Sequence, residues 1–191
     1  MHNQDKTQLL IYKRSPSLSL SALDMNTCSI MKILGVFLNP ELTWHDQVDE
    51  MCKKASKRLR ILRVLKPHVC EMELHQVYAA TVLSVFDYAC QLFVGLETGL
   101  SMRLQRIDNR AHRIIFGKEA RSCDCPPNSV KLRRENLSKR LLQKLMQQGG
   151  ILSDCLPQAL PRSKKLSNFF CRTERRRRSF FPFTTYLANT D

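Results

Sequence analysis

Apolar side chains recur at intervals of three and four residues along most of the chain, which is the period of an amphipathic helix. The first such stretch predicts a helix over 44–65, with Thr43 as its N-cap and Pro67 as its stop. Its apolar stripe consists of Val48, Met51, Ala55, Leu59, Leu62 and Leu65. Similar stripes predict three further helices, over 71–93, 100–116 and 129–148.

Two short apolar runs, 8–13 and 29–38, precede the first helix and are typical of β-strands. The segment between them is rich in serine and contains Pro16, which indicates a loop. A two-stranded hairpin is barely stable alone in water, so we expect it to pack against the helices or against another domain. Beyond residue 150 the chain is basic and shows no sustained period, which predicts a largely disordered tail.

These patterns predict a mainly α fold in three parts. A short β-hairpin lies within 1–40, a bundle of about four helices occupies 41–150, and the basic, poorly ordered tail occupies 151–191. No apolar run reaches the roughly 18 residues that cross a bilayer. The polar start of the chain, MHNQDKTQLL, is unlike a secretory signal. We therefore expect an intracellular protein, nuclear or cytoplasmic, that is not secreted.

The charge balance changes this picture. Lysine and arginine number 31 against 17 acidic residues, which gives a formal net charge of +14. Such a surplus favours polyanionic partners, because their binding releases counterions. We expect nucleic acid, either RNA or a DNA–RNA duplex, and expect no membrane partner, although an anionic membrane surface is the second choice on charge alone. The plain alternative is a basic protein without such a partner, and no pattern indicates which protein partners it has.

The basic residues cluster in three places. The candidate nucleic-acid contacts are Lys53, Lys54, Lys57, Arg58, Arg103, Arg106, Arg110, Arg113, Arg175, Arg176, Arg177 and Arg178. On a helix, the intervals of three and four in the second cluster place its guanidinium groups on one side. The alternative for the first two clusters is that they only solvate their helices. The run 175–178 is also typical of a nuclear import signal or of a charged disordered tail.

Motifs for catalysis or metal binding are missing from the sequence. The eight cysteines are irregularly spaced, and Cys123-Asp-Cys125 is not the pair of a zinc knuckle, so we expect free thiols in a reducing compartment. The five histidines show no ligand spacing, and no nucleophile elbow or phosphate-binding glycine loop occurs. Asp46 and Asp49 come nearest to a carboxylate pair and are more typical of helix-start residues. We expect no catalytic residue, metal, cofactor or small-molecule substrate.

Several short motifs follow one another in a fixed order. Asn-x-x-Lys-Thr at 3–7 precedes the first predicted strand, and Leu-Gly-Val stands at 34–36. Leu-Thr-Trp at 42–44 begins the first predicted helix, which contains Lys-Lys-Ala-x-x-Arg-Leu at 53–59. Farther on come Asp-Tyr-Ala at 87–89, Gln-x-x-x-x-Arg-Ala-x-Arg-Ile-Ile at 105–115 and Ser-Phe-Phe-Pro at 179–182.

In this order the motifs resemble the C-terminal part of LINE-type, Jockey-like non-LTR retrotransposon reverse transcriptases, over nearly the whole chain. That family has Glu-Tyr-Gly where this chain has 87–89, and tryptophan where it has Phe93 and Ala188. The same series of motifs is shared by a cassette named after the N-terminal part of a tRNA-modifying AlkB homologue. The iron-binding His-x-Asp motif of the AlkB dioxygenases does not occur in this sequence.

The resemblance implies a role for each part of the chain. The first strands would be the edge of the palm, and Leu34, Gly35 and Val36 would form a primer-grip-like turn. The basic helix from Trp44 would be the thumb along the template–primer duplex, followed by a post-thumb region. Lys6 would match the family's lysine near the incoming nucleotide.

Polymerisation itself requires more than these parts. Nucleotidyl transfer needs paired carboxylates that hold two Mg²⁺ ions about 4 Å apart, and the sequence contains no Asp-Asp pair. The first hypothesis is therefore a truncated reverse-transcriptase-like protein that is no enzyme on its own and binds nucleic acid passively. The second is an independently retained helical module that binds nucleic acid or a protein. The third, an enzyme that acts within a larger complex, has no motif in its favour.

Overall fold

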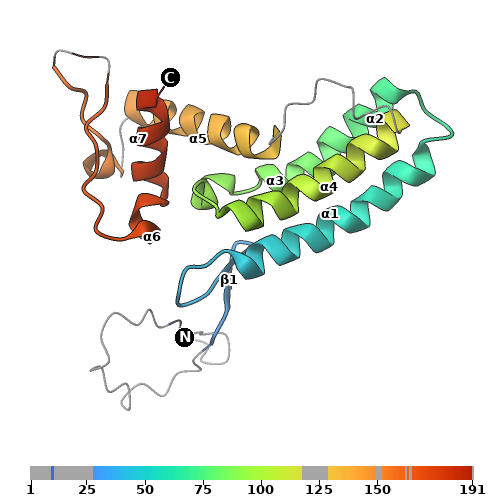
Figure 1. The fold of residues 1–191 in the computed structure, drawn as a ribbon, viewed down its shortest axis with the longest axis horizontal. Coiled ribbons are helices and arrows are strands. Elements are labelled where there is room, and N and C mark those ends of the chain that lie inside the picture. The colour runs from blue at the N-terminus through green and yellow to red at the C-terminus, as the bar shows by residue number, and fades with distance from the viewer. Residues whose placement is uncertain are drawn as a thin grey trace, which may run out of the picture. The chain divides into compact units, whose positions relative to one another are not determined.

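The computed structural model describes residues 10, 28–117, 129–148, 152–161, 163 and 165–190. The chain divides into two units, Met1–Glu50 and Met51–Asp191, and the boundary lies within its first helix. The predicted class is confirmed, because a two-stranded hairpin is followed by helices that dominate the rest of the described chain (Figure 1).

In the first unit, strands β1 (Met31–Ile33) and β2 (Val36–Leu38) form an antiparallel hairpin in which Ile33 pairs with Val36. The turn residues Leu34 and Gly35 have φ values of 46° and 83°, and two positive φ angles are typical of the tight turns that match the twist of a hairpin. The prediction of one continuous strand over 29–38 is therefore wrong, because the turn divides it in two. The other predicted strand, 8–13, lies outside the described residues apart from Leu10, which has no regular structure.

The start of helix α1 (His45–Leu65) is organised by the side chain of Asn39. Its Nδ2 donates to Thr43 Oγ1 at 2.7 Å and to Asp46 Oδ2 at 3.2 Å, and its Oδ1 accepts from the Thr43 amide at 2.9 Å. The Thr43 hydroxyl, which was predicted to cap the helix, is thus bound to Asn39 instead. Gln47 Oε1 accepts from the Phe37 amide at 3.0 Å, which fixes β2 to the first turn of α1.

The second unit begins inside α1 and contains most of the buried apolar side chains. The predicted stripe of α1 is confirmed except at its end, because Met51, Ala55, Leu59 and Leu62 are all buried whereas Leu65 is half-buried. After α1 come α2 (Glu71–Tyr78), the π-helical segment η2 (Ala79–Leu83), α3 (Ser84–Asp87) and the 3₁₀ turn η3 (Cys90–Phe93). Helices α4 (Thr98–Phe116) and α5 (Ser129–Gln148) follow, almost as predicted.

The predicted helix over 71–93 is correct only in part. Ala89 has a φ of 52°, in the left-handed region, and this residue separates α3 from η3. An α-helix cannot continue through such a residue, so the chain turns after Asp87. The π-helical segment η2 is a second irregularity within the same stretch. Neither feature has a signature in the hydrophobic period.

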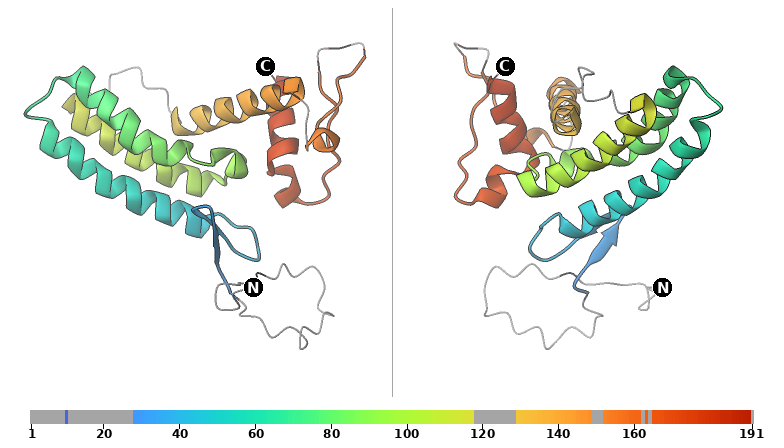
Figure 2. Two further views of the ribbon diagram at one scale, coloured as in Figure 1. Left: turned by 180° about the vertical axis from the view of Figure 1, so that it is seen from behind. Right: turned by 45° about the vertical axis from the view of Figure 1, so that its right-hand side comes forward.

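The prediction of a largely disordered C-terminal tail is wrong for its last part. The short 3₁₀ turn η5 (Ser153–Cys155) and the one-turn helix α6 (Glu174–Arg177) precede helix α7 (Phe180–Thr190), which packs against α5 (Figures 1 and 2). The buried face of α7 contains Thr184 and Thr185. Because these side chains are polar, the sequence of α7 does not show the pattern of apolar residues that predicts an amphipathic helix. The Asn189 amide also pairs with both backbone groups of Leu166, at 2.8 and 3.0 Å.

Gly95 allows the C-terminal segment to pack closely. A Cβ atom placed on Gly95 would lie 2.5 Å from the carbonyl oxygen and 2.7 Å from the Cα of Arg178. Both are backbone atoms, which cannot move aside as the end of a flexible side chain does. The approach of the Arg178 backbone to the chain before α4 therefore requires glycine at this position.

Candidate nucleic-acid interface

The outer face of α1 beyond Met51 is strongly basic. Lys53, Lys57 and Arg60 are exposed and, at 100° per residue, lie within about 60° of one another on the side opposite the buried stripe. In the described part of the chain, none of these three side chains has an ionic or hydrogen-bonding partner. Lys54 is also exposed but has a further interaction. The predicted cluster on α1 is thus available to solvent, with one exception.

Arg58 is the exception, because the structure uses it to join helices. Its Nη1 donates to the carbonyl oxygen of Thr81 and, at 3.3 Å, to Ser84 Oγ. Thr81 belongs to η2, where the π-helical geometry changes the backbone hydrogen-bond pattern and leaves carbonyl groups to be satisfied by other donors. Arg58 therefore connects α1 to the irregular part of the next helix. The sequence prediction placed it with the phosphate contacts, whereas these bonds hold its guanidinium inside the unit.

The second basic stripe lies on α4. Arg106, Arg110 and Arg113 are exposed, whereas Arg103 is half-buried and has a further interaction. The opposite side of α4 is buried by Leu104, Ile107, Asp108, Ala111 and Ile115. From Arg103 to Arg113 the stripe is about 15 Å long, at 1.5 Å per residue. Its three exposed guanidinium groups have no ionic partner among the residues that the structure describes.

The two basic stripes lie on neighbouring helices. In both figures of the whole fold, α1 beyond Met51 runs alongside α4 (Figures 1 and 2). At the C-terminal ends of the two helices, Lys66 Nζ donates to the carbonyl oxygen of Ile114 at 2.5 Å. The structure thus places two groups of exposed cations, which are about 50 residues apart in the sequence, on adjacent helices of one bundle.

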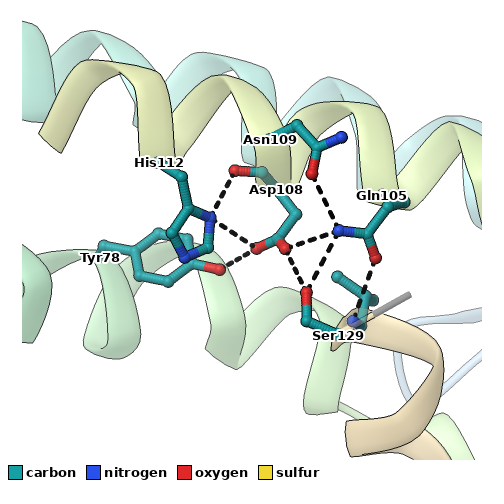
Figure 3. A network of polar contacts seen from close by, with 7 residues as sticks. Tyr78, Gln105, Asp108, Asn109, His112 and Ser129 are labelled. Atoms are coloured by element: carbon teal, nitrogen blue, oxygen red, sulfur yellow. Dashed lines mark hydrogen bonds and ion pairs between the residues drawn. The ribbon is translucent and has the colours of Figure 1, made fainter. Parts of the chain in front are cut away.

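A buried polar network fixes α4 against α2 and α5. Figure 3 shows Asp108 between Tyr78 and Ser129. The Asp108 carboxylate, 1% exposed, accepts hydrogen bonds from Tyr78 Oη, from Ser129 Oγ at 2.6 Å and from Gln105 Nε2 at 3.0 Å. His112 Nδ1 lies 3.0 Å from the backbone oxygen of Asp108 and 3.7 Å from its carboxylate. Because the serine donates directly to the carboxylate, no imidazole stands between them as a general base.

Gln105 extends this network to the start of α5. Its Oε1 accepts from the Val130 amide at 3.2 Å, and its Nε2 also donates to Asn109 Oδ1 at 3.0 Å. One side chain thereby satisfies an amide in the first turn of α5, where helical partners are lacking. The network holds the basic helix α4 in place and does not itself reach the exposed arginines.

Two arginines of α5 are also structural. Arg133 forms a bidentate pair with Asp87 at the end of α3, with both N–O distances 2.7 Å, and this hydrogen bonding raises the pKa of its guanidinium. Arg134, 3% exposed, donates to the carbonyl oxygen of Val94 at 3.3 Å and to Ser101 Oγ at 3.2 Å. Burial lowers the pKa of Arg134, although arginine remains charged at neutral pH.

The run 175–178 divides into exposed and anchored members. Arg178 donates to Glu97 at 3.2 Å and to Glu174 at 2.9 Å, so it fastens the start of α7 to the residue before α4. Arg177 also pairs with Glu174, at 2.9 Å, but its side chain stays 66% exposed. Arg175 and Arg176 are exposed. Three of the four arginines thus remain accessible to a polyanion.

The predicted primer-grip-like turn lies at the tip of the hairpin. Leu34 is 86% exposed and Val36 is buried.

The described residues contain no group of three or more His, Cys, Asp or Glu side chains that could hold a metal ion, and no helix long and apolar enough to cross a membrane. An open apolar depression is lined by Cys70, Glu71, Met72, His75 and Phe116. Cys90 is fully buried, and this burial, together with Asp87, raises the pKa of its thiol to about 11.

Sequence reasoning missed the residues that hold the bundle together. Asp108 gave one available signal, because a lone carboxylate inside the apolar stripe of 100–116 must find partners when it is buried. Arg133 and Arg134 gave none, since α5 also contains Lys131, Lys139 and Arg140, and nothing in the residue types separates these basic residues. No family model, curated protein or solved structure matches this chain.

Proposed function

We propose that this chain is a non-catalytic relative of non-LTR retrotransposon reverse transcriptases that binds RNA or a DNA–RNA duplex through its basic helices. The observation that carries the proposal is a set of exposed cations on α1 and α4 that have no ionic partner among the described residues, namely Lys53, Lys57, Arg60, Arg106, Arg110 and Arg113. A surface arginine or lysine without an acidic partner gains more from a phosphate than one that must first leave a carboxylate. The ordered sequence motifs supply the suggested ancestry.

The bonds formed by other basic residues narrow the interface. Arg58, Arg133, Arg134 and Arg178 each bind groups within the protein, so we exclude them from the main nucleic-acid contacts. The core of the proposed interface consists of Lys53, Lys57, Arg60, Arg106, Arg110 and Arg113. The exposed arginines 175–177 are an accessory site. This division gives each basic residue either a structural or a binding role that can be tested separately.

The experiment compares three charge-reduced variants of the full chain. One carries K53Q, K57Q and R60Q on α1, and one carries R106Q, R110Q and R113Q on α4. The control carries K131Q, R140Q and K144Q, which removes three exposed cations from α5, a helix outside the proposed interface. Fluorescence anisotropy with a labelled RNA and a labelled DNA–RNA duplex measures the dissociation constant of each variant.

We expect the α1 and α4 variants to bind at least about tenfold more weakly at 50 mM salt, since each triple removes up to three phosphate contacts. The α5 variant should stay within about threefold of the wild type, because only the general field of the protein changes. Equal losses in all three variants would mean that net charge alone drives binding, and the proposed interface would be wrong. A primer-extension assay with Mg²⁺ should give no product from the chain alone.

A further inference from the structure

Three serines in the chain have a basic residue at both the second and the third position before them. They are Ser56, Ser167 and Ser179. Kinases that discriminate substrates by charge use acidic pockets to bind such basic residues, so the sequence alone offers three equivalent acceptors. The structure distinguishes them, because a kinase must bind the segment around the serine in an extended form with the hydroxyl accessible.

Ser56 and Ser167 are poor acceptors in the folded protein. Ser56 lies in the middle of the 21-residue helix α1, and its neighbours Ala55 and Leu59 are buried. Extending the chain there would break a long helix and expose part of the core. Ser167 is half-buried, its Oγ accepts from the Gln158 amide at 2.9 Å, and its own amide donates to Gln158 at 2.7 Å.

Ser179 differs from both. It is exposed and lies in the bend between α6 and α7, where its Oγ donates to the carbonyl oxygen of Arg176 at 2.7 Å. Helix α6 is a single turn of four residues with no buried side chain, so its opening costs little. Arg176 and Arg177, at the third and second positions before Ser179, are both exposed. The side that a charge-reading kinase would bind therefore faces solvent.

We propose that Ser179 is a phosphorylation site for an arginine-directed serine/threonine protein kinase. In the reaction, Ser179 Oγ attacks the γ-phosphorus of Mg-ATP, ADP leaves with the electrons of the broken P–O bond, and the hydroxyl proton passes to the catalytic base of the kinase. The kinase and ATP are supplied from outside this chain. Arg178 anchors the end of this segment, because its backbone lies against Gly95 and its side chain binds Glu97 at 3.2 Å, so the extension that the kinase needs falls on α6.

The modification changes the charge of the accessory basic site. Glu174 and the four arginines after it have a formal charge of +3. A phosphoserine adds a charge of about −2 at neutral pH, and its oxygens bind arginine side chains through charge-assisted hydrogen bonds. The phosphate would also precede the first turn of the 11-residue helix α7, where negative charge is favourable. Phosphorylation would thus remove this run from polyanion binding, a consequence that rests on the proposed function.

The test is phosphorylation of the full chain by the catalytic subunit of an arginine-directed kinase with Mg-ATP. We expect an added mass of about 80 Da per chain, which peptide mapping locates on Ser179. Ser179→Ala should take up no phosphate, and Ser179→Thr should restore uptake. The double variant R176Q/R177Q should be modified at least about tenfold more slowly. Its matched control, K53Q/K54Q, should react at the wild-type rate because Ser56 is not the acceptor.

Phosphate on Ser56 or Ser167 with Ser179 unmodified would overturn the proposal, as would the absence of uptake. A second arm measures RNA binding of the modified and unmodified chains at 50 mM salt, where we expect about a three- to tenfold loss of affinity on modification. If the unmodified chain does not bind RNA, the proposed function fails while the phosphorylation site stands. If it binds and modification leaves the affinity unchanged, the regulatory consequence is wrong.

Discussion

The buried network around Asp108 predicts that the effect of Tyr78→Phe on stability depends on whether Asp108 is present. Tyr78 is 2% exposed and its hydroxyl donates to the Asp108 carboxylate, which also accepts from Ser129 and Gln105. A hydrogen bond to a charged group contributes roughly 1.5–3 kcal/mol to stability. Tyr78→Phe should therefore lower the free energy of unfolding of the wild type by about 2 kcal/mol.

Asp108→Ala removes the acceptor instead of the donor. It abolishes three hydrogen bonds and leaves the buried Tyr78 hydroxyl without this carboxylate, so we expect a loss of roughly 3–5 kcal/mol. In this background Tyr78→Phe should cost little, because the carboxylate that accepted from the tyrosine hydroxyl is gone. The coupling energy of the double-mutant cycle should be about 2–3 kcal/mol.

Urea unfolding followed by circular dichroism at 222 nm measures the four free energies. Tyr186→Phe is the control, since Tyr186 is 60% exposed and its change should stay within about 0.5 kcal/mol. Additive effects of Tyr78→Phe and Asp108→Ala would refute the reasoning. That result would mean that the hydroxyl and the carboxylate do not act on each other across the interface between α2 and α4.

Three further predictions concern the backbone and the thiols. Ala89→Gly should stabilise the protein by roughly 0.5–1 kcal/mol in the same assay, because glycine adopts a φ of 52° without the steric cost of a Cβ; a loss of stability would contradict the left-handed turn. Gly95→Ala should cost roughly 2 kcal/mol or more and increase proteolysis near α7, since the new Cβ would overlap the Arg178 backbone; wild-type stability would contradict that packing. Raising the pKa of the Cys90 thiol from 9.0 to about 11 reduces its thiolate fraction about 100-fold at pH 8. Iodoacetamide should therefore label the exposed Cys70 and Cys155 in the folded protein and Cys90 only after unfolding, as followed by mass spectrometry.

The Cys90 thiol also has a consequence for the pH dependence of stability. Its folded pKa lies above the unfolded value, so folding favours the protonated thiol. The contribution is fully present below about pH 9 and is lost as the pH rises toward 11. Cys90→Ser or Cys90→Ala variants should show a smaller loss of stability over this range than the wild type.

The sequence predicted the helices whose apolar stripes are long and regular. Helix α5 begins and ends at the predicted residues, and the stripe of α1 is buried as expected from Val48 to Leu62. The prediction failed where a single residue decides the local geometry. Leu34 and Ala89 both have positive φ angles that leucine and alanine rarely adopt, so their residue types did not indicate the hairpin turn or the end of α3; a turn at 34–36 was implied by the resemblance alone.

For the candidate interface, the sequence predicted which basic residues are exposed but not which of them bind groups within the protein. Periodicity placed Lys53, Lys57 and the arginines of α4 on exposed faces, because charged residues between apolar stripes almost always face water. It could not show that Arg58 binds the carbonyl oxygen of Thr81, since that acceptor depends on the π-helical segment η2. The structural role of Arg178 likewise depends on Glu97, which lies 81 residues earlier in the chain.

The salt dependence of binding tests the central claim most directly. If the six cations of α1 and α4 each replace a counterion on a DNA–RNA duplex, a plot of the logarithm of the association constant against that of salt concentration should have a slope of about −5. The slope should fall in magnitude by about 2.7 in the K53Q/K57Q/R60Q variant and again by a similar amount in R106Q/R110Q/R113Q. A slope near zero for the wild type, or slopes unchanged in both variants, would contradict nucleic-acid binding through these two helices.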